Sequence, residues 1–210
     1  MARRIESHWI SGPAGRLEAR VEEPEERAPL VAALVCHPHP LYGGTMHNKV
    51  VYRMARGLRR SASVVLRFNF RGVNLSEGKH DEGRGEVEDA RAALAFLRER
   101  YPDLPYALAG FSFGSRVILR LGCSLPEPKP RRLIAVGFPT KLGRYEYLAS
   151  CALPKYFIQS TNDEHGPQPA LEAAFQTFAE PKSLGFIEAG DHFFAGALEQ
   201  LEDAVARLPR

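Results

Sequence analysis

The chain contains 210 residues, 44% of them hydrophobic, and its 28 basic and 25 acidic side chains leave a formal net charge of +3. This length and composition predict a single globular domain spanning residues 1–210. The basic residues are scattered in short pairs, which argues against the concentrated basic surface of a nucleic-acid-binding protein. The N-terminal stretch lacks the apolar core of a signal peptide, and no apolar run reaches transmembrane length. We therefore expect a cytoplasmic protein with no membrane contact.

The three cysteines, Cys36, Cys123 and Cys151, are widely spaced, odd in number and without a CxxC pair. This pattern favours reduced thiols over a framework of disulfides. Reduced thiols also agree with the expected cytoplasmic location.

The first predicted element is an antiparallel hairpin, in which HWI and LEARV flank the turn sequence SGPAG. Strand-like apolar runs then alternate with amphipathic, helix-like stretches. The predicted strands cover residues 30–36, 63–70, 106–111, 131–138, 154–160 and 182–189. The predicted helices cover residues 48–60, 86–101, 114–124, 169–180 and 193–208. This alternation is typical of an α/β fold with a mostly parallel, twisted sheet and helices on both faces.

In such a sheet, ligands bind beyond the carboxyl ends of the strands. One of these ends carries GFSFG, Gly110 to Gly114, a G-x-S-x-G pattern where a predicted strand runs directly into a helix. Glycines two residues on either side of Ser112 let the chain reverse tightly and expose the serine hydroxyl. The Phe113 N–H, at the start of the helix, could then donate to a developing oxyanion. The alternative is a serine that only caps the helix.

A serine nucleophile needs a base to take its proton and an acid to orient that base. Asp163 follows the strand 154–160, and His192 follows the strand 182–189. The chain order Ser112, Asp163, His192 is the one that α/β-hydrolase folds use. These three residues are therefore the predicted catalytic triad.

Other residues compete for two of these roles. Glu164 and Asp191 are alternative acids, although Asp191 adjoins His192 and is better placed to cap the last helix. His165 is the alternative base, and it would need its loop to fold back over the serine. His192 itself could be a surface imidazole without a catalytic role.

An acyl-transfer site also needs a second N–H donor opposite Phe113, and the loop CHPHPLYGG after the strand 30–36 is placed to supply it. Pro38 and Pro40 have no N–H and stiffen this loop. We favour the Leu41 N–H as the second donor, with the His39 N–H as the alternative.

The histidines of this loop also raise the possibility of a metal site made by His37, His39 and His47. Two of them precede prolines, the third lies beyond a Gly-Gly turn, and apart from Cys36 no cysteine or carboxylate completes a ligand set. A phosphate cradle is weaker still, because the glycines lack the GK[ST] ending of a P-loop. We expect neither a metal nor a cofactor.

Taken together, HPHPLYGG, LRFNFRGVNLSEG, GFSFG, the NDE stretch and GDHFF resemble the small prokaryotic α/β-hydrolases that are related to dienelactone hydrolases and dipeptidyl-peptidase-like hydrolases. The resemblance runs from about residue 5 to the C-terminus and implies an α/β-hydrolase fold. It maps the triad of that group onto Ser112, Asp163 and His192. Such proteins commonly carry glycine where this chain has Asn74, a difference that is tolerable if the backbone there is left-handed.

The length of one connection bears on the substrate. Only about 15 residues separate the strands 131–138 and 154–160, where lid insertions of this fold usually lie, so we expect an open site with no lid domain. Tyr42 and Phe193 are candidate substrate-binding residues among several aromatics that could instead pack in the core or rim. Arg71 could steer an anionic substrate, but a structural role on loop carbonyls is favoured.

The sequence thus predicts a serine hydrolase that cleaves a carboxylic ester or thioester of a small-molecule acyl substrate through an acyl-enzyme. A peptidase or acyltransferase on the same triad is an alternative, as is a non-catalytic binding module on this fold. A homodimer is possible because symmetric pairs are common.

Overall fold

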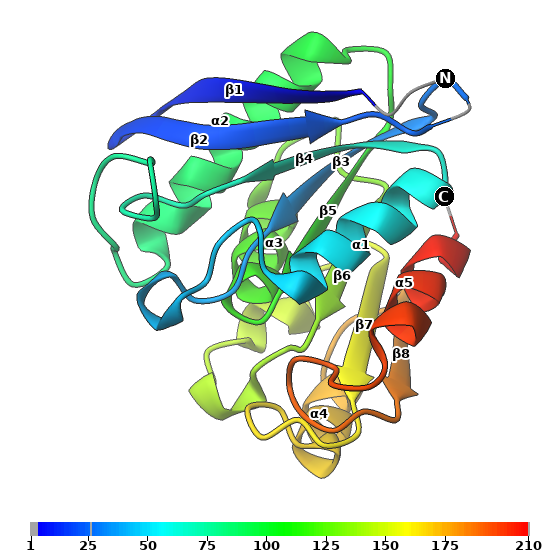
Figure 1. Ribbon diagram of the computed structural model, residues 1–210. Helices are drawn as coiled ribbons and strands as arrows, with labels where there is room; N and C mark the ends of the chain where they lie inside the picture. The colour runs from blue at the N-terminus through cyan, green and yellow to red at the C-terminus, as the bar shows by residue number, and fades with distance from the viewer. Residues whose placement is uncertain (1–3, 26, 210) are drawn as a thin grey trace.

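The computed structural model describes residues 4–25 and 27–209, and its strands form one eight-stranded sheet (Figure 1). The strands are β1 (Ile5–Gly12), β2 (Gly15–Glu22), β3 (Val31–Cys36), β4 (Ser63–Phe68), β5 (Tyr106–Phe111), β6 (Arg132–Val136), β7 (Lys155–Ser160) and β8 (Lys182–Ile187). Their order across the sheet is β1-β2-β4-β3-β5-β6-β7-β8. The β1–β2 hairpin and the β2–β4 pair are antiparallel, and the other pairs are parallel. The predicted mostly parallel sheet with an N-terminal antiparallel hairpin is confirmed.

Helices cover both faces of this sheet, as predicted (Figure 1). They are α1 (Lys49–Arg60), α2 (Arg84–Arg100), α3 (Phe113–Ser124), α4 (Gln168–Gln176) and α5 (Leu198–Arg207). Helices α1 and α5 pack side by side on one face, and α2 and α3 cover the other. Side chains alternate between the faces along a strand, so Leu34 of β3 belongs to the core under α2 and α3, whereas Val35 belongs to the core under α1 and α5.

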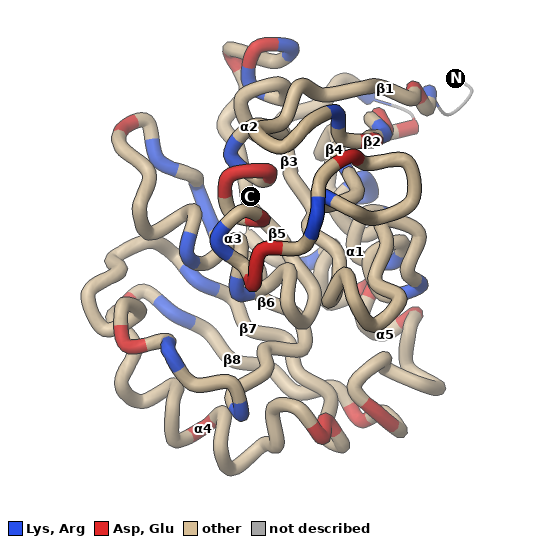
Figure 2. Tube along the Cα trace, turned by 90° about the vertical axis from the view of Figure 1, so that its left-hand side faces the viewer, with Lys and Arg blue, Asp and Glu red and all other residues tan. Residues whose placement is uncertain are grey.

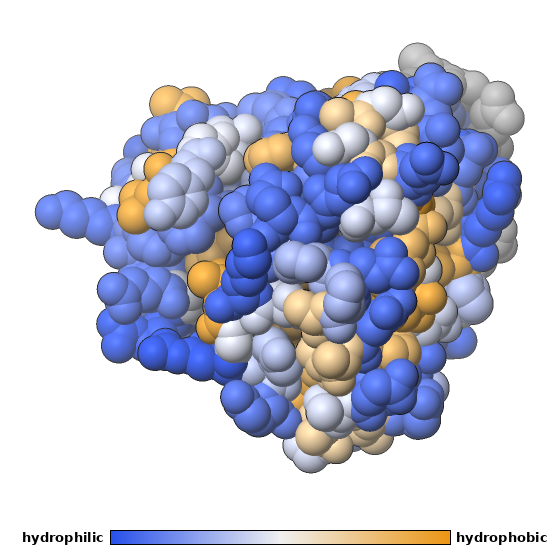
Figure 3. Space-filling model, turned by 90° about the horizontal axis from the view of Figure 1, so that it is seen from below, coloured by the Kyte–Doolittle hydropathy of each residue, from blue (hydrophilic) through white to orange (hydrophobic). Residues whose placement is uncertain are grey.

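Strand β8 forms one edge of the sheet, and its residues are at most partly buried. Leu184 and Phe186 pack against one core and Ile187 against the other. Figure 3, seen from the side where α4 and β8 lie lowest in Figure 1, shows hydrophobic strips between larger hydrophilic areas. No helix within the described ranges is long and apolar enough to cross a membrane.

The connection between β6 and β7 is short, as the sequence predicts. It contains two single turns of 3-10 helix, η2 (Thr140–Leu142) and η3 (Glu146–Ala149), and no inserted domain. The prediction that the fold has no lid domain is therefore confirmed. Residues of this connection, and not of a separate domain, border the space at the carboxyl ends of the central strands.

The last helix begins later than the sequence predicts. Residues 193–197 form turns instead of the first helical turns, because Phe194 and Gly196 both have positive φ angles, 57° and 81°. The Phe194 N–H donates to the Asp191 carbonyl at 3.1 Å, and the Phe194 side chain is fully buried in the core. This anchored turn, rather than a helix start, carries His192.

The expectation of three reduced thiols is wrong for two of them. Cys123, near the end of α3, and Cys151, after η3, form a disulfide with their Cα atoms 5.5 Å apart, and only Cys36 is a free thiol. The two cysteines are 28 residues apart in the chain, and only the packing of η3 against α3 brings them together. A wide spacing therefore concealed the pair in the sequence.

The disulfide generates a prediction for stability. Because it closes a loop of 28 residues, its loss should lower the free energy of unfolding by about 3 kcal/mol through the greater entropy of the unfolded chain. Urea unfolding of the wild type and of the Cys123→Ser/Cys151→Ser variant should differ by this amount without reductant. The two proteins should converge when a reductant is added, and identical curves without reductant would show that the bond does not form in solution.

Candidate active site

Ser112 lies in a sharp turn between β5 and α3, with φ 54° and ψ −118°. Positive φ is unfavourable for a serine, and close packing on both sides holds it. A Cβ at Gly110 would lie 2.2 Å from the Gly114 carbonyl oxygen, and a Cβ at Gly114 would lie 2.4 Å from the Cys36 carbonyl oxygen. Only glycine therefore fits at either position, as the sequence pattern indicated.

The serine side chain does not serve the helix. Ser112 occupies the N-cap position of α3 without a side-chain capping bond, which disfavours the alternative of a simple helix cap. Its backbone N–H donates to the Val136 carbonyl at 2.9 Å, and its own carbonyl accepts from the Ser115 N–H and hydroxyl at 2.9 and 2.5 Å. The backbone of Ser112 is thus held from β6 and α3, while its hydroxyl is left for a ligand.

Asp163 and His192 meet although 29 residues separate them. His192 Nδ1 lies 2.7 Å from Asp163 Oδ2, and both residues are 2% exposed. Burial strengthens this bond, because the surroundings are less polarisable than water. The contact fixes the imidazole so that Nδ1 faces the carboxylate and Nε2 is directed elsewhere.

The Asp163 carboxylate has further partners in its own loop. Oδ1 accepts from the backbone N–H groups of His165 and Gly166 at 2.8 and 2.9 Å, and Oδ2 also accepts from Gln159 Nε2 at 2.9 Å. Burial alone would raise the pKa of Asp163, but the hydrogen bond and charge of His192, with the two backbone donors, hold that pKa below its ordinary value. The carboxylate is therefore ionised at neutral pH.

Gln159 is a residue that sequence reasoning missed. Its side chain is fully buried on β7, where Nε2 donates to Asp163 and to the Gly166 carbonyl and Oε1 accepts from the Phe138 N–H at 2.8 Å. The available signal was an amide inside the apolar run YFIQS, since a buried polar side chain needs partners. Gln159 joins the acid loop to the end of β6.

The ring of His192 is positioned by contacts as well as by its hydrogen bond. It stacks on Phe111 with the centroids 4.8 Å apart. A Cβ at Gly137 would lie 3.0 Å from His192 Cε1 and 2.7 Å from a Phe111 ring carbon, so the glycine leaves room for both rings. The imidazole is clamped between β5 and the start of the β6–β7 connection.

The alternative acids have other bonds. Glu164 accepts from the backbone N–H of His192 at 3.3 Å, and Asp191 accepts from the Ala195 N–H at 2.9 Å. Neither carboxylate bonds to the His192 ring. The alternative base, His165, is about half exposed and packs edge-on to His192 with the centroids 4.6 Å apart. Only Asp163 is therefore placed to orient His192.

A cavity of about 690 Å³ opens at the carboxyl ends of β3, β5 and β6, and Ser112, Phe113 and His192 all line it. Among the described residues the Ser112 hydroxyl makes no hydrogen bond to His192. Such contacts are often long without substrate and tighten when it binds. The cavity brings the candidate nucleophile and base to one space that a ligand can enter.

The structure disfavours the Leu41 N–H as the second oxyanion donor. Its N–H donates to His39 Nδ1 at 3.2 Å, its side chain is 67% exposed, and the residue does not line the cavity. His39 does line the cavity, and within residues 4–25 and 27–209 neither its N–H nor that of Phe113 has an acceptor. Because His39 lines the cavity and Leu41 does not, the His39 N–H is better placed than the Leu41 N–H to be the second oxyanion donor.

His37 holds this loop in place. The ring is fully buried, Nδ1 donates to the Pro38 carbonyl at 2.6 Å, and Nε2 accepts from the Phe70 N–H at 3.0 Å. Both ring nitrogens are thus occupied by backbone groups. His39 Nδ1 is likewise used within the loop, and the part of the chain that the structure describes contains no group of side chains able to hold a metal.

The predicted substrate-binding aromatics, Tyr42 and Phe193, both line the cavity. Tyr42 is 85% exposed, at the mouth of the cavity. Phe194, which follows Phe193, is buried in the core and does not line the cavity. Arg71 does not reach the cavity, because its guanidinium pairs with Asp89 at 2.7 Å and donates to the Gly85 carbonyl at 2.8 Å. The structural role favoured for Arg71 agrees with these bonds.

Asn74 has φ 48°, the left-handed backbone at which asparagine is tolerable in place of glycine. It belongs to the turn after β4, which Ser76 closes by donating from its hydroxyl to the Asn69 carbonyl at 2.8 Å. This turn lies away from the cavity, and none of these three residues lines it.

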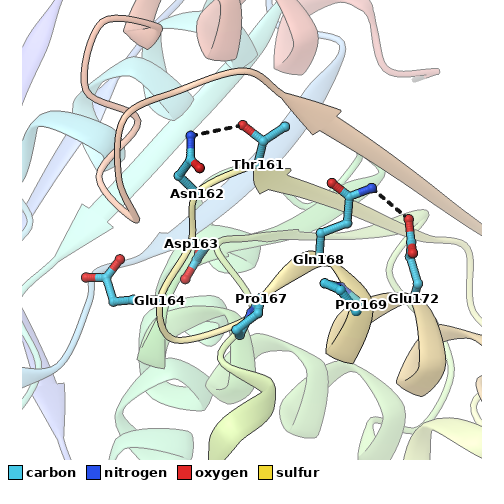
Figure 4. Close-up of a pocket in the computed structure, with 8 residues that line it drawn as sticks. All are labelled: Thr161, Asn162, Asp163, Glu164, Pro167, Gln168, Pro169 and Glu172. Atoms are coloured by element: carbon cyan, nitrogen blue, oxygen red, sulfur yellow. Dashed lines mark hydrogen bonds between the residues drawn. The ribbon is translucent and has the colours of Figure 1, made fainter.

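A second hollow, about 490 Å³ and wide open, lies beside the loop that follows β7 (Figure 4). Asp163 and Glu164 contribute to it, and Figure 4 shows Gln168 bonded to Glu172 on its α4 side. Neither Ser112 nor His192 lines this hollow. It therefore contains neither the candidate nucleophile nor the candidate base.

A serine in a strand-turn-helix elbow, with an acid and a histidine after later strands of a mostly parallel sheet, defines the α/β-hydrolase class. Residues 33–204 match a family model described as an alpha/beta hydrolase domain, and the chain belongs to this family.

Relatives at moderate identity agree with this assignment. The chain is 36% identical over 207 residues to an uncharacterised protein of Rickettsia prowazekii, covering 94% of this chain and 85% of that one. It is similar to an alpha-beta serine hydrolase homologue from Coxiella burnetii, with 36% identity, a TM-score of 0.88 and 96% of each chain covered. A serine hydrolase from Xanthomonas campestris described as lacking a lid gives 35% identity and a TM-score of 0.88, covering 98% of this chain and 93% of that one.

The buried His37 generates a prediction for pH dependence. Burial lowers the pKa of His37 to about 3, whereas an unfolded chain has a histidine pKa of about 6.5. Between these values the unfolded state binds the extra proton, so stability should fall as the pH drops from about 6.5 to 3, by up to about 1.4 kcal/mol per pH unit. The His37 ring signal in NMR spectra, assigned with a His37→Gln variant, should not titrate between neutral pH and pH 5. A midpoint near 6 would show that the ring is not clamped as described.

Proposed function

We propose that this protein is a serine hydrolase that cleaves a carboxylic ester or thioester through an acyl-enzyme. The observation that carries the proposal is the 2.7 Å bond between Asp163 and His192, made beside a cavity that His192 shares with the strained Ser112 elbow. In this arrangement Ser112 is the nucleophile, His192 the base and Asp163 the orienting acid.

The reaction runs in two halves. Ser112 Oγ attacks the carbonyl carbon while His192 Nε2 takes its proton, and the same proton passes to the leaving alcohol or thiol as the tetrahedral intermediate collapses. Water then attacks the acyl-serine with His192 again as base, and the acid product leaves. Asp163 stabilises the imidazolium in both halves and stays ionised, in keeping with its lowered pKa.

The backbone N–H groups of Phe113 and His39 are the proposed oxyanion donors. Both residues line the cavity, and neither N–H is used elsewhere in the described residues. The Phe113 N–H opens the 12-residue helix α3, so the positive end of the helix dipole lies behind it. Donors fixed by the backbone need no rearrangement as charge develops on the oxygen.

Ser112→Ala provides the first test. Removal of the nucleophile should abolish turnover of short acyl esters, a loss of at least about 10⁴-fold, while the fold is kept. Wild-type protein should gain the mass of one fluorophosphonate adduct, and Ser112→Ala should gain none. Full esterase activity in folded Ser112→Ala, or an adduct on another residue, would sink the proposal. A panel of ester, thioester and aminoacyl-amide substrates then identifies the preferred bond.

His39 allows the second oxyanion donor to be removed almost alone. Its φ of −55° suits a proline, so His39→Pro deletes the N–H at a compatible φ, while the matched His39→Ala variant keeps it. Both variants lose the imidazole that accepts from Leu41. The kcat of His39→Pro should be about 10²- to 10³-fold below that of His39→Ala. Equal kcat values for the two variants would place the second donor elsewhere.

A further inference from the structure

One wall of the cavity is strongly basic. Arg116 of α3 and Lys141 and Arg144 of the β6–β7 connection line it, and Glu82 is the only carboxylate residue among its described lining residues. None of the three cations forms an ion pair with a carboxylate in the described part of the chain. Among the described lining residues, positive charge on the cavity wall therefore exceeds negative charge.

Several buried or half-buried arginines elsewhere have a carboxylate partner. Arg67 pairs with Glu22, Arg71 with Asp89, and Arg53 with Glu202. Arg116 is likewise only partly exposed, yet within the described part of the chain its guanidinium makes one hydrogen bond, to the neutral Gly143 carbonyl at 2.8 Å. A partly desolvated guanidinium with one neutral acceptor leaves most of its donors available to a ligand.

The position of Arg116 relates it to the reacting atoms. It follows Ser112, the N-cap residue of α3, by four residues, and both residues line the cavity. Burial is the main cause that lowers the pKa of Arg116. The positive charges of Arg120 and Arg144 lower this pKa further, whereas Tyr147 and Glu146 act in the opposite direction. A bound anion would offset both the cost of removing the Arg116 guanidinium from water and its repulsion by the neighbouring arginines.

The other two cations belong to a connection that is tied to the acid loop. The Lys141 N–H donates to the His165 carbonyl at 3.2 Å, and the Gly143 N–H donates to the Thr140 carbonyl at 3.0 Å. Figure 2, turned to face the left-hand side of Figure 1, shows several Lys and Arg segments around α3 and β6. The basic wall thus has one fixed side on a helix and one on an anchored loop.

We propose that the cavity takes an ester or thioester that carries a second, anionic group, a carboxylate or a phosphate, bound by Arg116, Lys141 and Arg144 while Ser112 attacks the acyl carbon. This inference rests on the proposed function and names its substrate class. The neutral oxyanion donors and the cationic wall then act on different parts of one substrate. A guanidinium binds either anion through two parallel N–H bonds, so the chemistry is shared and experiment separates the two.

The test compares pairs of substrates that differ by one carboxylate. One pair differs in the acyl group, 4-nitrophenyl hexanoate against 4-nitrophenyl hydrogen adipate, and one in the leaving group, phenyl acetate against 4-carboxyphenyl acetate. Wild type should show a higher kcat/KM for the anionic member of at least one pair. Added salt should reduce that preference, because screening weakens attraction to a half-exposed basic wall.

The variants assign this preference to the wall. Arg116→Gln should reduce the ratio of anionic to neutral kcat/KM by about 10- to 100-fold, the range for loss of a charged hydrogen bond. Lys141→Gln/Arg144→Gln should reduce it as well, and this double variant leaves the Arg116 bond to Gly143 in place. Arg120→Gln is the matched control, since Arg120 lies on the same helix without lining the cavity. Its charge acts on Arg116 only from a distance, so this variant should change the ratio far less than Arg116→Gln.

Binding measurements separate this inference from the proposed function. Calorimetry of adipate and of hexyl phosphate with Ser112→Ala needs no turnover, and the tighter of the two identifies the anion. Either anion should bind more weakly when Arg116→Gln is added. Neutral esters hydrolysed through Ser112 without any anionic preference would overturn this inference alone. Anion binding that depends on Arg116, without ester turnover, would uphold the basic site and overturn the proposed hydrolase.

Discussion

The backbone of Ser112 is the constraint on which the site depends. Its φ of 54° and ψ of −118° place a serine in a region that costs an L residue roughly 1–3 kcal/mol. The turn persists because β5 lies at the centre of the sheet and α3 packs across it, with Gly110 and Gly114 allowing backbones to touch. Packing of the core thus holds the Ser112 hydroxyl and the Phe113 N–H, which has no acceptor among the described residues, beside the same cavity.

A second consequence of the buried core is the polar chain from Gln159 through Asp163 to His192. Each link is a hydrogen bond of 2.9 Å or less between nearly fully buried groups. A charged carboxylate in such a place is tolerated only because four hydrogen bonds reach it. One of these bonds, from His192, also orients the imidazole, so the contact that helps to stabilise the buried carboxylate also positions the base.

The sequence predicted features that arise from local steric rules or from strand ends. The G-x-S-x-G pattern located the elbow, and the residues after β7 and β8 located Asp163 and His192. Features that depend on tertiary packing were missed: the Cys123–Cys151 disulfide and the role of Gln159. The sequence also could not decide between the N–H groups of Leu41 and His39, because that choice depends on which way a short loop faces.

The late start of α5 belongs to the same group, since the burial of Phe194 overrides the helical pattern of its neighbours.

The cavity wall is built in two ways, and these differ in how freely they can change. His39, Phe113 and Ser112 are fixed through backbone geometry that the sheet and α3 impose, so substitutions there disturb the fold or the chemistry. Lys141 and Arg144 are exposed side chains on a connection that contributes little to either core. Charge on that connection can therefore vary without disturbing the fold, as the proposed role of Lys141 and Arg144 in substrate selection requires.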